Sequence, residues 1–143
     1  TYPLREICVM DDAVARIKAD KTATSLRSSH LTTETPFKWF NIREDGYYKP
    51  LIQGMTVDEV NSPRQAFPAT YIPDGYVDVL RTQFIIDNHL MHGDRAIGFI
   101  VPDGIDIDFM KDFDNVTRYI EEHQSDLYDY LSSNFKPLES LSL

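Results

Sequence analysis

The sequence predicts an α/β fold, a mostly parallel sheet with helices packed on it, and two observations support this prediction. First, segments whose apolar residues recur every three or four positions alternate with segments of strand length and composition. The predicted helices are residues 7–19, 82–88 and 109–122, and the predicted strands are residues 22–27, 76–80 and 97–101. Second, residues 37–51 carry a hairpin pattern. Together these features predict a Rossmann-like sheet of few strands with a projecting β-hairpin.

The helix predicted at residues 7–19 has one apolar face. Val9, Ala13 and Ile17 follow one another at intervals of four, which places them on the same side of a helix. Acidic residues stand early in the segment and a lysine stands late, as the helix dipole favours. The β-prone residues 22–27 follow directly. We therefore expect one helix–strand unit of a doubly wound sheet near the start of the chain.

The predicted hairpin consists of aromatic and apolar residues on both sides of an Asp45-Gly46 turn. It carries more aromatic side chains than a solvated hairpin needs. These side chains either pack on their own domain or contact a second subunit. Residues 52–63, which follow the hairpin, are expected to form a connecting loop.

The next part of the chain is expected to be extended, then to turn, then to form a strand. Pro68 and Pro73 keep the first part extended. Asp74-Gly75 is a turn signal, and residues 76–80 alternate as in a strand. The short apolar helix at residues 82–88 is expected to be buried.

Two aspartates follow the strand expected at residues 97–101. In Ile105-Asp106-Ile107-Asp108 apolar and acidic residues alternate, so an extended backbone would place Asp106 and Asp108 on one face. Two carboxylates at the end of a strand are suited to a hard divalent cation such as Mg²⁺. Alternatively, Asp108 caps the following helix and Asp106 is solvated. The spacing alone leaves both interpretations open.

The helix predicted at residues 109–122 is expected to face the core. Met110, Phe113 and Val116 recur at intervals of three, which is typical of a helix with one buried face. A last helix is expected between residues 124 and 143.

Composition limits the classes of partner and compartment. A chain of 143 residues, 42% of them hydrophobic, is large enough for one compact domain with its own core. The net charge of −9 argues against nucleic acid and against an anionic membrane as partners, because both are polyanions. The single cysteine, Cys8, excludes an intrachain disulfide and indicates a reducing compartment. No run approaches the roughly 20 apolar residues that span a bilayer, and no leader is recognisable, so a cytoplasmic location is expected.

Four stretches of the chain, taken in order, resemble the acylneuraminate cytidylyltransferase family, the CMP-sialic acid synthetases. The stretches are Thr1-Tyr2-Pro3-Leu4-Arg5, Pro36-Phe37-Lys38 with Asp45-Gly46, the segment from Pro63-Arg64-Gln65 through Pro68 and Tyr71 to Asp74-Gly75, and Gly104-Ile105-Asp106-Ile107-Asp108 with the acidic helix after it. The resemblance implies a dimeric, Mg²⁺-dependent enzyme that joins CTP to a nonulosonic sugar acid and releases pyrophosphate. It also implies that residues 36–63 form the arm through which two subunits associate.

The resemblance implies roles for individual residues. Asp106 and Asp108 match the metal-binding, catalytic carboxylates of the family. The implied substrate-binding residues are Thr1, Lys38, Arg64, Asp74, Gly75 and Asp78. In the family, the lysine that matches Lys38 approaches the sugar, and the arginine that matches Arg64 lies near the pocket of the partner subunit.

Three positions depart from the family's pattern. Tyr2 stands where the family usually has serine, Asp74 where it usually has asparagine, and Asp78 where it commonly has tyrosine or another polar side chain. An acidic residue that faces an acidic sugar repels it unless a cation or an arginine intervenes. The identity of the sugar acid therefore stays open.

The glycine-rich, basic loop that holds the nucleotide triphosphate in the family is not recognisable, because the six glycines are scattered along the sequence. We therefore expect the chain to be the C-terminal part of a larger nucleotidyltransferase domain, inactive toward CTP by itself. The alternative is a non-catalytic fragment or subunit that dimerises and binds a sugar acid. No arrangement of serine, cysteine and histidine supports nucleophilic catalysis.

Overall fold

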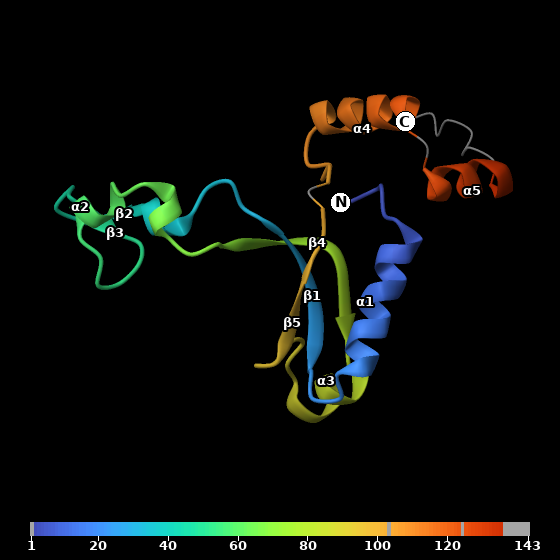
Figure 1. Ribbon diagram of the computed structural model, residues 1–143, viewed down its shortest axis with the longest axis horizontal. Coiled ribbons are helices and arrows are strands. Elements are labelled where there is room, and N and C mark those ends of the chain that lie inside the picture. Colours follow the sequence, from blue (N-terminus) through green and yellow to red (C-terminus); the bar gives the residue numbers. More distant parts are fainter. Residues whose placement is uncertain (1, 103, 124, 136–143) are drawn as a thin grey trace. The chain divides into compact units, whose positions relative to one another are not determined.

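The computed structural model describes residues 2–102, 104–123 and 125–135 of the chain (Figure 1). The chain falls into two compact units. The first unit comprises residues 1–29 and 73–143, and the second comprises residues 30–72. The region 36–63, which the resemblance implies to be an arm, lies within the second unit.

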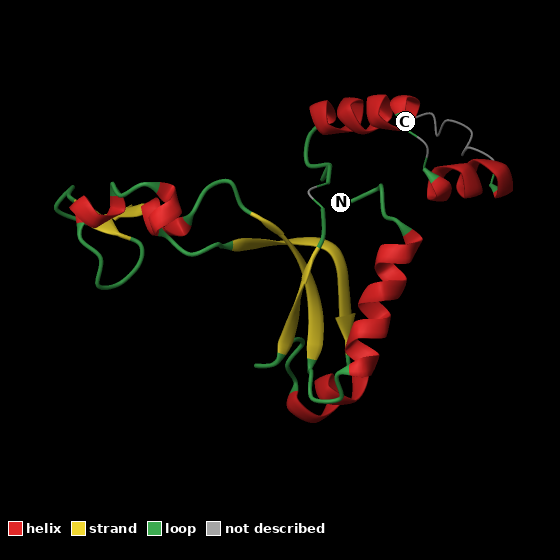
Figure 2. Ribbon diagram, in the orientation of Figure 1, coloured by secondary structure: helices red, strands yellow, loops and turns green. Residues whose placement is uncertain are grey.

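Three strands form a mixed sheet, drawn as yellow arrows in Figure 2. They are β4 (Tyr71–Leu80), β1 (Ser25–Leu31) and β5 (Ala96–Ile100), in that order across the sheet. β1 and β5 are parallel, with Ser25 opposite Ala96 and Ser29 opposite Ile100. The predicted α/β class is confirmed, and one pair of neighbouring strands is parallel.

β1 begins at Ser25, whereas the sequence predicts a strand from residue 22. The reason is a turn held by Asp20. The Asp20 carboxylate accepts hydrogen bonds from the backbone N–H groups of Thr22, at 2.9 Å, and Ala23, at 3.2 Å. A backbone committed to this turn cannot join the strand, so the strand starts after it.

The helices of the first unit are α1 (Ile7–Ala19), α3 (Thr82–Asn88), α4 (Met110–Glu122) and α5 (Asp126–Asn134). α1 and α3 have the predicted bounds, and α5 is the expected last helix. α1 lies beside the sheet (Figure 1) and buries Ala13 and Ile17. The buried core of this unit consists of Tyr2, Ala13, Ile17, Ala23, Leu26, Tyr76, Phe99 and Val101.

Two of the predicted buried helix faces are exposed. None of the α3 residues is buried, and Ile86 is 60% exposed. In α4 only Val116 is buried, while Met110 is 77% and Phe113 is 54% exposed. The helical periodicity is correct, but among the described residues nothing covers the apolar side chains Ile86, Met110 and Phe113.

The turn predicted at Asp74-Gly75 is wrong, because both residues lie inside β4. Gly75 has φ +70°, a left-handed conformation that side chains disfavour, so the strand bends locally without ending. The Asp74 carboxylate accepts the backbone N–H of Tyr76 at 3.0 Å and the hydroxyl of Ser28 at 2.5 Å. The Ser28 hydroxyl in turn accepts the N–H of Val77 at 2.9 Å. The side chains of Asp74 and Ser28 therefore accept the backbone N–H groups of Tyr76 and Val77, next to the glycine that distorts the strand.

The second unit contains the predicted hairpin. β2 (Phe40–Ile42) and β3 (Tyr48–Pro50) pair antiparallel, with Ile42 opposite Tyr48. Residues 52–63 are not only a loop, because they contain the short helix α2 (Val57–Val60). Thr56 and Glu59 form a capping box at its start: the Thr56 hydroxyl accepts the N–H of Glu59, and the Glu59 carboxylate accepts the N–H of Thr56. This capping pair is a sequence signal that the loop prediction missed.

Within the described residues, no helix combines the length and the apolar character needed to cross a bilayer.

Candidate functional site

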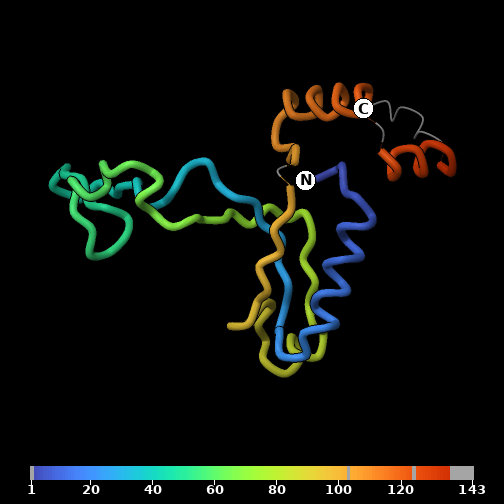
Figure 3. The backbone as a smooth tube through the Cα atoms, viewed as in Figure 1, coloured from blue at the N-terminus to red at the C-terminus, as the bar shows by residue number. Residues whose placement is uncertain are grey.

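Three segments that are far apart in the sequence meet within the first unit. Figure 3 shows the start of the chain beside the segment that follows β5. The rings of Tyr2 and Tyr76 pack edge to face, with their centroids 5.8 Å apart, and both side chains are buried. Gly104 approaches Tyr2 so closely that a Cβ atom at Gly104 would lie 2.8 Å from Tyr2 Cε1. The contacts join the N-terminal segment, β4 and the segment before α4.

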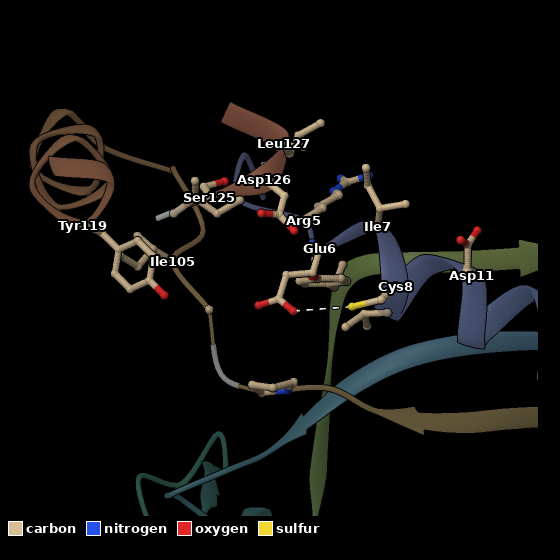
Figure 4. A pocket seen from close by; sticks show the side chains of 15 residues that line it. Arg5, Glu6, Ile7, Cys8, Asp11, Ile105, Tyr119, Ser125, Asp126 and Leu127 are labelled. Atoms are coloured by element: carbon tan, nitrogen blue, oxygen red, sulfur yellow. Dashed lines mark hydrogen bonds between the residues drawn. The ribbon is translucent and has the colours of Figure 1, made fainter. Parts of the chain in front are cut away.

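A cavity of about 650 Å³ lies where these segments meet. Its walls mix apolar and polar side chains, and they come from the start of α1, β4, the segment after β5, and the region where α4 ends and α5 begins. Figure 4 shows Glu6 and Cys8 on one side of it and Ile105 and Tyr119 on the other. A cavity of this volume is within the range of small-molecule sites.

Tyr76 connects the cavity to the start of α1. Its phenol oxygen accepts the backbone N–H of Glu6 at 2.6 Å, although Glu6 provides no side-chain cap to the helix. Burial raises the pKa of Tyr76, and the nearby Glu6 carboxylate raises it further. The phenol therefore stays protonated at neutral pH and remains a hydrogen-bond donor as well as an acceptor.

Arg5 supplies the positive charge of the cavity wall. Its Nε donates to the carbonyl of Tyr2 at 3.1 Å, which orients the side chain along the N-terminal segment. Glu6, Asp11 and Asp126 line the same cavity. The wall thus carries three carboxylates and one guanidinium, and Cys8 adds a thiol that donates to Glu6 at 3.7 Å. The sequence analysis assigned a site role to none of these polar residues, although Arg5 belongs to one of the four stretches of resemblance.

The two aspartates of the predicted metal site follow the cavity residues Gly104 and Ile105. Asp106 is half-buried and Asp108 is exposed. The strand expected at residues 97–101 is present as β5, which ends at Ile100, and residues 104–107, expected to be extended, lie in no strand or helix. No strand pairing fixes the two carboxylates on one face, so their common orientation stays a prediction.

The start of α4 is held by Asp112. Its carboxylate accepts the N–H of Phe109 at 2.9 Å and the N–H of Asp108 at 3.2 Å. The residue at the N-cap position is Phe109, whose side chain has no acceptor atom, so only the reciprocal half of a capping box is formed. The alternative in which Asp108 caps the helix is wrong, since Asp112 fills this role.

The donor set of the acidic segment fits Mg²⁺ in one respect. Among the described residues, no three histidines, cysteines or carboxylates lie close enough together to hold a metal ion by themselves. Mg²⁺, however, is usually bound through one or two carboxylates together with water and phosphate oxygens. Asp106 and Asp108 would therefore hold Mg²⁺ only together with water or phosphate oxygens, and not with a third histidine, cysteine or carboxylate of the described residues.

Lys38 and Arg64 lie in the second unit and contact nearby backbone. Lys38 Nζ donates to the carbonyl of Ser62 at 3.0 Å, and the Arg64 guanidinium donates to the carbonyl of Thr32 at 2.5 Å. Both side chains are exposed, and both connect the segment around residues 62–64 to the chain that precedes the hairpin.

The remaining predicted substrate residues lie in β4 or outside the described part of the chain. Asp74 bonds Ser28 and Tyr76, as described above, so its carboxylate stabilises the sheet. Asp78 forms an ion pair with Arg27, with 3.5 Å between carboxylate and guanidinium. Thr1 lies outside the described residues.

No protein-family model matches the chain, and no curated protein matches it.

Proposed function

We propose that the protein is a cytidylyltransferase that activates a nonulosonic, sialic-type sugar acid, converting CTP and the sugar acid into a CMP-sugar and pyrophosphate. One observation carries this proposal. Arg5, Gly104 and Tyr76, which directly follows Asp74-Gly75, line one cavity, and Tyr2 packs against Gly104 and Tyr76. They lie in or next to three of the four stretches that resemble the acylneuraminate cytidylyltransferases. Residues that act on one substrate have to lie together, and a chance resemblance would not require this.

A Rossmann-like sheet is part of the proposal. The parallel pair of β1 and β5 supports it, because open α/β sheets bind ligands beyond the carboxyl ends of their parallel strands. Pro102, Gly104 and Ile105, which line the cavity, follow the carboxyl end of β5. The cavity is therefore at the end of the strand where such a fold binds its substrates.

Asp106 and Asp108 are the residues that would hold Mg²⁺ in this enzyme. When bound, Mg²⁺ neutralises phosphate charge and lowers the pKa of the sugar hydroxyl that attacks the α-phosphate. The chain's own residues bind and orient the sugar acid. Arg5 offers a guanidinium to an acidic group, and Tyr76 offers a protonated phenol. Direct phosphoryl chemistry of this kind needs no covalent nucleophile.

In the proposed enzyme, Lys38 and Arg64 are substrate-binding residues, and the second unit is the arm through which two subunits associate. Exposed aromatic side chains of this unit, among them Trp39 and Tyr48, support a contact with a second copy. Cys8 is a free, exposed thiol, which supports a reducing compartment such as the cytoplasm.

Substitution of the two aspartates tests the proposal. In the whole protein, Asp108→Asn keeps the side-chain shape but removes one charge, so we expect the release of pyrophosphate from CTP and N-acetylneuraminic acid to fall on the order of 100-fold. Asp106→Asn is expected to have a milder effect. Binding of Mn²⁺ as a probe for Mg²⁺, in the presence of CTP, should weaken in parallel.

Asp114→Asn is the matched control, because Asp114 is an exposed aspartate of α4 outside the acidic segment. It should leave both measurements unchanged. Equal pyrophosphate release and equal Mn²⁺ binding in Asp108→Asn and the unsubstituted protein would contradict the proposal. Binding of the sugar acid without any reaction of CTP would instead favour the non-catalytic alternative.

A further inference from the structure

Tyr2 of the N-terminal segment packs closely against Gly104 of the acidic segment 104–108. A Cβ atom at Gly104 would lie 2.8 Å from Tyr2 Cε1 and 3.3 Å from Cδ1, which is too close for real carbon atoms. Gly104 does not have the left-handed φ angle that favours glycine. Its backbone conformation would therefore accept alanine without strain. The ring of Tyr2 is therefore what requires glycine here.

The Tyr2 ring cannot easily move to make room. It is 7% exposed, and it packs edge to face against Tyr76, which is itself 6% exposed. The phenol of Tyr76 is bonded to the backbone of Glu6 at the start of α1. Close-packed interiors respond to an added methyl group by shifting the more weakly held part. Residues 104–107 lie in no strand or helix, so we expect their backbone to shift before the buried Tyr2 ring does.

We propose that Tyr2 is a positioning residue for the acidic segment: its ring, which packs against Tyr76 and Gly104, sets the position of the backbone that carries Asp106 and Asp108. Their role as metal ligands rests on the proposed function, whereas the positioning itself rests on the packing of Tyr2. Asp106 and Asp108 are two and four residues from the contact, so displacement of Gly104 moves both carboxylates together. A bound cation tolerates little displacement of its ligands, and loss of the groups that orient such ligands lowers metal affinity about 10- to 100-fold.

Gly104→Ala tests the proposal, with Gly98→Ala as the matched control. Gly98 lies in β5, and a Cβ atom there would meet nothing within 4 Å. We expect Gly104→Ala to weaken Mn²⁺ binding in the presence of CTP by on the order of 10-fold. Amide hydrogen exchange at residues 104–108 should become faster in Gly104→Ala. Gly98→Ala should change neither measurement.

A double substitution separates positioning from general loss of stability. Tyr2→Leu removes the ring atoms that the new Cβ would meet, so Tyr2→Leu combined with Gly104→Ala should bind Mn²⁺ more tightly than Gly104→Ala alone. If Tyr2→Leu only destabilised the fold, its loss of Mn²⁺ affinity would instead add to the loss caused by Gly104→Ala. All variants are compared at a temperature at which their circular dichroism shows them folded.

The outcomes distinguish this inference from the proposed function. If the unsubstituted protein binds no Mn²⁺ with CTP, the proposed function fails, and hydrogen exchange alone decides whether Tyr2 positions the segment. If Mn²⁺ binds, but Gly104→Ala matches Gly98→Ala in affinity and in exchange, the positioning role is wrong and the proposed function stands. An additive loss in the double variant would also overturn the positioning role.

Discussion

Asp20 shows how one side chain decides where α1 ends and β1 begins. Its carboxylate accepts the Thr22 hydroxyl at 2.7 Å, in addition to the backbone N–H groups of Thr22 and Ala23. These bonds, with the Thr22 hydroxyl as the largest contribution, lower the pKa of Asp20 below its usual range. The ionised carboxylate is therefore favoured in the folded state over the unfolded chain.

Acid should remove the contribution of Asp20 to folding. Because its pKa is lowered on folding, the stabilisation is complete above the ordinary carboxyl range and is lost as pH falls below about 4. We expect Asp20→Asn to reduce the free energy of unfolding at pH 7, and we expect the difference from the unsubstituted protein to shrink toward pH 2–3. Urea unfolding at a series of pH values measures both.

Thr22 provides the paired variants for that experiment. Thr22→Ser keeps a hydroxyl that can donate to Asp20, and it should behave like the unsubstituted protein. Thr22→Val removes the hydroxyl and should reproduce part of the Asp20→Asn effect. A pH-independent difference between Asp20→Asn and the unsubstituted protein would contradict the assignment.

The C-terminal end of α1 depends on an arginine from elsewhere in the chain. The Arg81 guanidinium donates to the carbonyls of Ile17 at 2.6 Å, Asp20 at 2.8 Å and Ala23 at 2.7 Å. Carbonyls at the end of a helix have no partner within the helix, and a cation there also interacts favourably with the helix dipole. Arg81 thus joins α1, the turn after it and the start of α3 into one packed element.

Arg81→Lys should destabilise this element although it keeps the charge. A lysine ammonium is a point donor, and it cannot reproduce the planar fork that reaches three carbonyls. We expect the free energy of unfolding to fall by roughly 1–3 kcal/mol, measured by urea denaturation. Lys21→Arg, in the exposed turn between Asp20 and Thr22, is the control and should be close to neutral. Equal stability of the two variants would mean that the Arg81 bonds contribute nothing.

At the scale of the whole molecule, the proposed homodimer needs an association surface, and exposed apolar residues of the second unit are the candidates for it. Ile42, Tyr47 and Tyr48 are among the most exposed large side chains of this unit, at 70%, 70% and 62%. A two-stranded hairpin is marginally stable alone in water, and burial against a second copy would stabilise it. The proposed homodimer would use this surface.

Trp39→Ala tests the dimer. Trp39 is 45% exposed and precedes β2, and loss of an interface tryptophan typically weakens association by about 30-fold or more, equivalent to about 2 kcal/mol. Light scattering over a range of protein concentrations should show the dimer dissociating at higher concentration in Trp39→Ala. Glu44→Ala, an exposed change in the hairpin turn, should leave the equilibrium unchanged. A monomer at all concentrations in the unsubstituted protein would contradict the dimer itself.

Local pattern sufficed to predict α1, α3 and the hairpin. The bounds of α1 and α3 follow from apolar spacing, and the hairpin follows from Asp45-Gly46, where Gly46 has φ +82° and the turn is closed by the Arg43 N–H to Tyr47 carbonyl bond. These features depend on interactions between residues a few positions apart, and such interactions can be inferred from the spacing of residues in the sequence.

Burial and the candidate site required the tertiary structure. The sequence by itself determined that α4 is amphipathic, but only the fold decided that Met110 and Phe113 are exposed, because burial depends on what packs opposite. The sequence also determined that Asp106 and Asp108 are two residues apart. Only the fold decided that Gly104, just before them, packs against Tyr2, about 100 positions away in the chain. Glu6, Tyr76 and Tyr119 enter the cavity for the same reason, since no spacing along the chain brings them together. Contacts between distant segments depend on the path of the whole backbone, and that path is decided when the core forms.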